Sequence, residues 1–181
     1  MADKARGEWE KYCRCARERG ASWARVVPAS YVVTAPWVRY KCRFGCGSYG
    51  ARHFCPPATP TPAETAAVVR CYNKTMLVAY ESARAGKQRA VRKKMHKDVL
   101  ALEREIFLDG FYKALAFVAG PCNLCGTCDV SKPCKLPGEP RPAMEACGID
   151  VFATFANAGV KLDVVRDPAG PYKVCGMVLI E

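Results

Sequence analysis

The sequence predicts an α/β fold: a single domain with a mixed sheet, a βαβ unit and a C-terminal hairpin. Apolar residues recur at helical spacing in several segments, which is typical of helices with one buried face. Short runs of β-branched and aromatic residues separate these segments and indicate strands. Half of the 181 residues are apolar and a quarter are charged, as in ordinary globular proteins. Since no repeat or linker divides the chain, we expect one domain over residues 1–181.

The chain is expected to begin with a helix and two strands. Apolar side chains share one side of a helix over residues 4–19. Residues 23–27 and 31–38 are rich in β-branched and aromatic types and therefore predict strands, which Pro28 and Pro36 limit.

A second helix is predicted to begin after Thr61, because the Thr61 side chain can cap it. Pro62 suits the first helical turn, and Glu64 can reach back to complete a capping box. This helix is expected to run to about Tyr72.

The middle of the chain predicts the βαβ unit. Residues 75–80 and 113–119 are short apolar runs that indicate strands. Between them, residues 88–108 place apolar side chains at steps of three and four, which makes one helical stripe that Gly110 can end. We expect the two strands to be parallel and joined by a right-handed crossover.

The C-terminal part predicts a helix and a hairpin. Residues 142–158 have a helical pattern that Gly148 can break. Residues 160–166 and 172–180 are predicted to pair around the turn-forming residues 167–170.

Charge and hydropathy restrict the compartment and the partners. The longest apolar runs are too short for a membrane span, and the N-terminus is charged where a signal peptide needs an apolar run, so we expect a cytoplasmic protein without membrane contact. The net charge of +11 would suit nucleic acid, but much of it lies in residues 87–97. A basic face there would equally dock an acidic redox partner, which is the partner that we favour over nucleic acid.

Twelve cysteines are the strongest functional signal, because seven of them fall into two groups. In a reducing compartment, clustered cysteines bind metal more often than they form disulfides. Both groups follow predicted strands, so we expect metal-binding loops at the strand ends, on one rim of the sheet. The first group is Cys42, Cys46 and Cys55; the second is Cys122, Cys125, Cys128 and Cys134.

The second group favours a [4Fe–4S] cluster. Its C-x2-C-x2-C run is that of bacterial ferredoxins, although five residues precede Cys134 where the ferredoxin run has three. A short irregular loop can offer three thiolates to three corners of a cubane. The alternative is a structural zinc site, which usually combines two separated C-x2-C pairs.

The first group is less specific, because three cysteines complete a cluster only with a fourth ligand. Without one, an open iron could bind substrate. The candidates for a fourth ligand are Cys13, Cys15, Cys71, Cys147, Cys175 and His53.

Other polar residues carry weaker signals. His53 is expected to face solvent from its loop, and His96 to be solvated among lysines on the polar side of its helix. Arg141 could tune the potential of a cluster, and Glu145 could act as an acid or base beside it. Phosphate-binding, dinucleotide-binding and nucleophile-elbow motifs do not occur, so these chemistries are unsupported.

Three motifs in combination resemble a known family. They are Lys41-Cys42…Cys46…Cys55-Pro56-Pro57, Gly120-Pro121-Cys122 with the three cysteines that follow, and Arg141-Pro142-x-Met144-Glu145-Ala146-x-Gly148-Ile149-Asp150. Together they resemble the small cysteine-rich prokaryotic proteins described as predicted metal-binding, whose function is unknown. The resemblance covers roughly residues 38–151 and implies metal binding by the two groups, without implying a reaction.

From the residues, the leading hypothesis is a protein with one or two [4Fe–4S] clusters that carries electrons or assists a larger redox enzyme. The alternatives are an enzyme that uses an open iron for Lewis-acid or sulfur chemistry, and a zinc-stabilised binding module.

Overall fold

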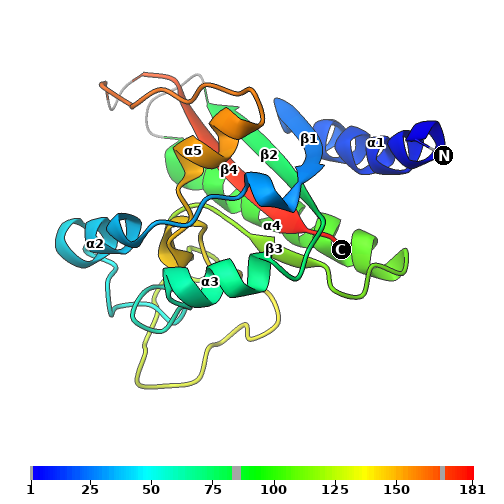
Figure 1. The fold of residues 1–181 in the computed structure, drawn as a ribbon. Coiled ribbons are helices and arrows are strands. Elements are labelled where there is room, and N and C mark those ends of the chain that lie inside the picture. The colour runs from blue at the N-terminus through cyan, green and yellow to red at the C-terminus, as the bar shows by residue number, and fades with distance from the viewer. Residues whose placement is uncertain (1, 83–86, 168–169) are drawn as a thin grey trace.

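One sheet forms the centre of the protein in the computed structural model, which describes residues 2–82, 87–167 and 170–181 (Figure 1). Within those residues the sheet has four strands in the order β1-β2-β4-β3, and each neighbouring pair is antiparallel. The strands are β1 (Trp23–Pro28), β2 (Lys74–Ser82), β3 (Leu115–Phe117) and β4 (Tyr172–Leu179).

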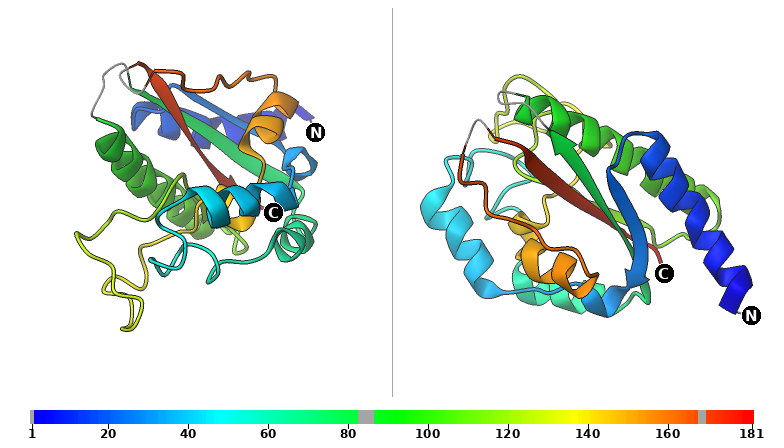
Figure 2. Two further views of the ribbon diagram at one scale, coloured as in Figure 1. Left: turned by 90° about the vertical axis from the view of Figure 1, so that its left-hand side faces the viewer. Right: turned by 90° about the horizontal axis from the view of Figure 1, so that it is seen from above.

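Helices cover both faces of this sheet (Figure 2). Helices α1 (Ala2–Glu18) and α4 (Gln88–Leu108) lie on one face, where Tyr12, Met95 and Leu102 enter a common core. The opposite face carries α2 (Pro36–Gly45), α3 (Pro62–Val69), α5 (Val151–Asn157) and the 3₁₀ turns η1 (Ala29–Tyr31) and η2 (Glu145–Cys147). Among the described residues, none of the helices combines the length and the apolar character that a bilayer crossing requires.

The α/β class and the parallel direction of the two strands around α4 are confirmed, but the predicted mixed sheet is wrong, because every neighbouring pair of strands is antiparallel. β2 and β3 run in the same direction and flank α4 in the sequence, yet β4 lies between them and is antiparallel to both. The reason is burial: β2 and β4 each carry six consecutive buried residues, whereas β3 has three residues. Strands that are covered on both faces take the central positions, and the short strand takes an edge.

Two further strand predictions fail. Residues 160–166 form no strand, so the C-terminal hairpin is absent and β4 pairs with β2 and β3 instead. Val164 and Val165 there are exposed, without the apolar cover that a strand face needs. Tyr31 ends the turn η1, and residues 32–35 make only an isolated bridge. Pro36 begins a helix rather than ending a strand, because proline suits a first helical turn.

The other elements agree with the sequence patterns. The capping box at Thr61 and Glu64 is present, although α3 ends at Val69. α4 has the predicted bounds. The helix predicted over 142–158 divides into η2 and α5 at Gly148, whose φ of +78° favours glycine.

Candidate metal centre

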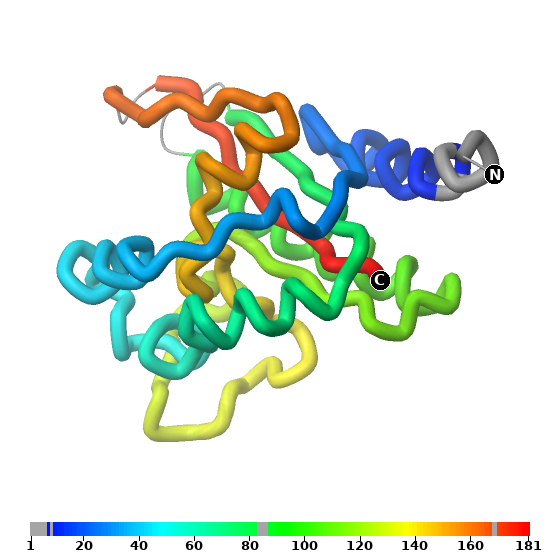
Figure 3. The backbone as a smooth tube through the Cα atoms, viewed as in Figure 1, coloured from blue at the N-terminus to red at the C-terminus, as the bar shows by residue number. Residues whose placement is uncertain are grey.

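Two long irregular segments carry the predicted ligands and lie on the same side of the molecule (Figure 3). The first, residues 46–61, follows α2, so the first cysteine group begins inside a helix and not at a strand end. The second, residues 118–144, follows β3 as predicted. The two loops are therefore neighbours, as expected, but only the second of them follows a strand.

The second cysteine group lines one cavity. All four thiol-bearing residues contribute, together with residues 52–54 of the first segment and Pro140; the full lining is Arg52, His53, Phe54, Cys122, Leu124, Cys125, Cys128, Cys134, Leu136 and Pro140. The enclosed volume is about 10 Å³, close to that of a single water site. Within the described residues, no three Cys, His, Asp or Glu side chains converge at metal-binding distances. The loop thus gathers the four donors around one point without holding them in ligand geometry.

The thiols of this group influence one another electrostatically. Burial raises the pKa of the Cys122 thiol, the Leu124 backbone lowers it, and the neighbouring thiols of Cys125, Cys134 and Cys128 raise it again. Because their negative charges would repel, thiolates gathered this closely need a cation to hold them together. A donor set of four thiols fits the soft cations, zinc and the irons of iron–sulfur clusters.

The first cysteine group is also gathered. Cys42 is half-buried on α2, Cys46 is exposed just after that helix, and Cys55 is buried at 6% exposure. Burial above all, together with the charges of Cys46, Cys42 and Cys122, raises the pKa of the Cys55 thiol to about 11, against the effect of Arg52. Cys55 therefore lies within electrostatic reach of both other members of its group and of the second group.

Two hydrogen bonds join the segments that carry the groups. Arg52 donates from Nη1 to the carbonyl oxygen of Cys122 at 2.9 Å. The ring nitrogen Nε2 of His53 lies 3.1 Å from the carbonyl oxygen of Asp129. His53 is thus half-buried and engaged with the second loop, and does not simply face solvent as the sequence predicted.

Helix α4 braces both ends of the second loop. At its start, the Asn123 side chain donates to the carbonyl oxygen of Arg89 at 3.1 Å. At its end, Arg141 binds Glu103 through an ion pair of 2.7 Å, and the same carboxylate accepts the Ala116 N–H at 2.9 Å. Arg141 therefore fastens the loop to the helix and the sheet, a role that spacing in the sequence does not reveal.

His96 belongs to this brace, and the prediction that it is solvated is wrong. It is 3% exposed, because residues 139–141 cover it. Its Nε2 atom accepts the Arg141 backbone N–H at 3.2 Å and lies 3.2 Å from the carbonyl oxygen of Glu139. The pKa of His96 is lowered, above all by its burial.

The variant His96→Gln is expected to reduce the loss of stability in mild acid. The folded pKa of His96 lies below the ordinary value, so as the pH falls through about 6.5 the unfolded chain takes up the proton first. The wild-type free energy of unfolding should therefore fall from about pH 6.5 downwards until the folded pKa is passed, whereas glutamine does not titrate.

Urea unfolding of both proteins at about pH 7.5 and about pH 5.5, followed by circular dichroism, checks this. Equal losses of stability in the two proteins would contradict the assignment.

A residue that the sequence left undistinguished holds the first group in place. Arg39, one helical turn before Cys42, places Nη1 2.8 Å from the carbonyl oxygen of Ala146, 2.6 Å from that of Pro60 and 3.0 Å from Oγ1 of Thr59. Nothing in the spacing of the basic residues on α2 distinguishes Arg39, so only the structure reveals this junction.

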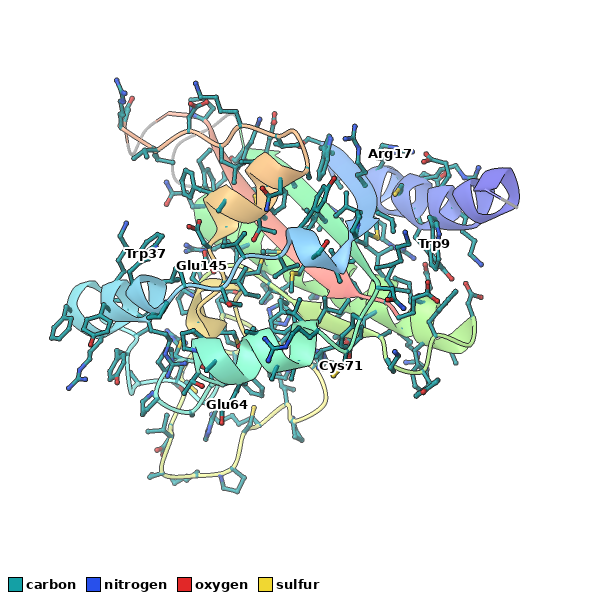
Figure 4. The ribbon with its side chains drawn as sticks, in the orientation of Figure 1. Trp9, Arg17, Trp37, Glu64, Cys71 and Glu145 are labelled. Atoms are coloured by element: carbon teal, nitrogen blue, oxygen red, sulfur yellow. The ribbon has the colours of Figure 1, made fainter. Side chains whose placement is uncertain are left out.

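Glu145 begins the turn η2, which meets α2 at Cys42 (Figure 4). The thiol of Cys42 lies 3.9 Å from its carbonyl oxygen as a weak donor. Its carboxyl oxygen Oε2 is buried and has no hydrogen-bond partner among the described residues. Burial raises the pKa of this carboxyl, while the backbone groups of Glu145 and Gly120 and the charge of Arg92 lower it.

Comparison with protein families gives one match. The family described as "Predicted metal-binding protein (DUF2284)" matches residues 25–180. No curated protein and no solved structure matches the chain. The matched range contains both cysteine groups, and the resemblance inferred from the three motifs is confirmed.

Proposed function

The chain belongs to the family of predicted metal-binding proteins, and from this premise we propose that its two cysteine groups hold [4Fe–4S] clusters. The protein would carry electrons or serve as a redox accessory of a larger enzyme. The observation that carries the proposal is the single cavity lined by Cys122, Cys125, Cys128 and Cys134, with Cys55 of the first group within electrostatic reach of Cys122.

The donor set favours a cluster over zinc. Three of the four thiols come from one overlapping C-x2-C-x2-C run on a segment without helix or strand, the arrangement that ferredoxins use for a cubane. Structural zinc sites more often join two separate pairs. A bound cluster would supply one-electron exchange; the chain's own part is to supply thiolates and to shield them with Leu124, Leu136 and Phe54.

Charge on α4 supports an acidic redox partner. Its N-terminal part exposes lysines and arginines beside the second group, to which Asn123 connects it through the Arg89 carbonyl. The exposed basic residues there are Lys87, Arg89, Lys93, Lys94 and Lys97. Lys94 is paired with Asp98 at 2.7 Å, which leaves the others to attract a negatively charged surface. Such complementarity speeds encounter and brings the partner close to the second group.

Purification without oxygen is expected to give a brown protein that contains iron and sulfide. Its absorbance at about 400 nm should bleach with dithionite, as that of thiolate-bound clusters does. Iron, sulfide and zinc are quantified on the same sample. A colourless protein with one or two zinc ions per chain would overturn the proposal and favour a zinc-stabilised binding module, for which salt-dependent binding to nucleic acid is the next measurement.

A further inference from the structure

A fourth cysteine lies on the turn that the first group contacts, on a separate segment of the chain. Cys147 ends the turn η2, two residues after Glu145, whose carbonyl oxygen is 3.9 Å from the Cys42 thiol sulfur. Cys147 is fully buried, so its side chain faces the interior at this contact.

Hydrogen bonds hold the carriers of these cysteines together. Arg39 and Cys42 lie on α2, and the Arg39 guanidinium contacts the carbonyl oxygens of Thr59, Pro60 and Ala146 at 3.1, 2.6 and 2.8 Å. The Thr59 hydroxyl also donates to Ala146 at 2.7 Å. The helix of Cys42, the segment just after Cys55 and the turn of Cys147 thus share one junction.

Gly148 fixes the end of the turn. Its φ is +78°, and a Cβ atom there would lie 2.4 Å from Cγ of Pro62, the first residue of α3. The close approach of η2 to α3 therefore requires glycine and sets the position of Cys147 beside it.

The other candidates lie elsewhere. Cys13 and Cys15 pack in the core on the α1 and α4 face, across the sheet from η2. Cys71 is exposed beyond α3, away from Glu145 in Figure 4, and its thiol lies 3.5 Å from the Ala67 carbonyl oxygen. Cys175 belongs to the same core cluster as Cys147, but it lies on β4 and not on the turn that Cys42 contacts. His53 is engaged with Asp129 of the second loop.

We infer that Cys147 is the fourth ligand of the first group, so that one metal centre is held by Cys42, Cys46, Cys55 and Cys147. That the metal is an iron–sulfur cluster rests on the proposed function. Four thiolates complete the coordination of a cubane, so the centre would carry electrons and leave no iron open to substrate. The competing role for Cys147 is that of a small apolar side chain in the core.

The test uses the full chain with Cys122, Cys125 and Cys128 all changed to serine. The iron content and the spectrum of this background protein then come from the first centre alone. In this background Cys147→Ala is compared with Cys175→Ala, a matched control that is also buried on the same face of the sheet. Cys147→Ala is expected to lose the cluster, or to show the electron paramagnetic resonance signal of a three-iron cluster. Cys175→Ala should keep the iron content and spectrum of the background. Circular dichroism reports the fold of each variant.

A second measurement needs no change at position 147. The background protein is loaded with zinc, and X-ray absorption counts the ligands of the ion. Four sulfur neighbours at about 2.3 Å are expected.

Three sulfurs with one nitrogen or oxygen would overturn the inference, as would a Cys147→Ala protein that keeps the cluster of its background. If the background binds neither iron with sulfide nor zinc, the proposed function of the first group fails as well, and the two failures are thereby distinguished.

Discussion

Changing Cys122, Cys125 and Cys128 together to serine is expected to remove about four iron atoms and four sulfides per chain from the anaerobically purified protein. Serine oxygen is a harder and more basic ligand than thiolate sulfur, and the remaining Cys134 cannot hold a cubane alone. The first group should keep its own content of about four irons, because its thiols belong to α2, the segment after it and η2.

The matched control is Cys15→Ser with Cys71→Ser, which changes two cysteines outside both groups. Iron and sulfide analysis of both proteins, with equal protein concentrations, decides the result. A comparable loss in the control, or full iron content in the triple variant, would show that the second group is not a cluster site.

Glu103→Ala is expected to lower the free energy of unfolding by about 3 kcal/mol. The Glu103 side chain is 8% exposed and holds the Arg141 guanidinium and the Ala116 N–H, so its removal leaves a poorly solvated cation and an unpaired donor. This loss of stability is at the lower end of the range for a broken buried ion pair. The reason is that Arg141 keeps its hydrogen bonds to the carbonyl oxygens of Gly138 and Pro140.

Glu105→Ala provides the control on the same helix. Glu105 pairs with Arg19, but its side chain is 40% exposed, so the change should cost no more than about 1 kcal/mol. Urea unfolding of the metal-free proteins measures both. Equal destabilisation by the two changes would mean that Glu103 does not brace the loop.

Local sequence patterns predicted the elements that local forces determine. The apolar stripe of α4 and the capping box of α3 each lie within a few turns of one helix, and both are present. The strand predicted over residues 31–38 was wrong. β-branched and aromatic residues there are typical of a strand, but Pro36 begins a helix. Residues 160–166 misled similarly: their valines suit a strand, but no neighbour covers Val164.

Long-range packing was beyond the reach of these patterns. β4 separates β2 from β3 because the most deeply buried strands occupy the centre of the sheet, and a strand's final neighbours are set by the whole core. His96 follows lysines in the sequence, and only the distant residues 139–141 make it buried. The roles of Arg39 and Glu103 depend on partners 107 and 38 residues away, so no local pattern indicates them.

For the site, the sequence identified the grouping of the cysteines, and the structure places four of them around one cavity that residues 52–54 of the first segment also line. Metal binding follows from the family, while the identity of the metal and of its ligands stays a prediction. Cys147 was one of several candidates that the sequence offered for the fourth ligand. Its place on the turn that contacts Cys42 comes from the packing of α2 on η2.

The bonds from Arg52 to Cys122 and from His53 to Asp129 couple the conformations of the two segments. When a metal ion orders one segment, these bonds also restrain the other segment. The second segment then loses less conformational entropy when it binds its own metal. At limiting metal, binding at one site should accordingly favour binding at the other, while each site keeps ligands of its own.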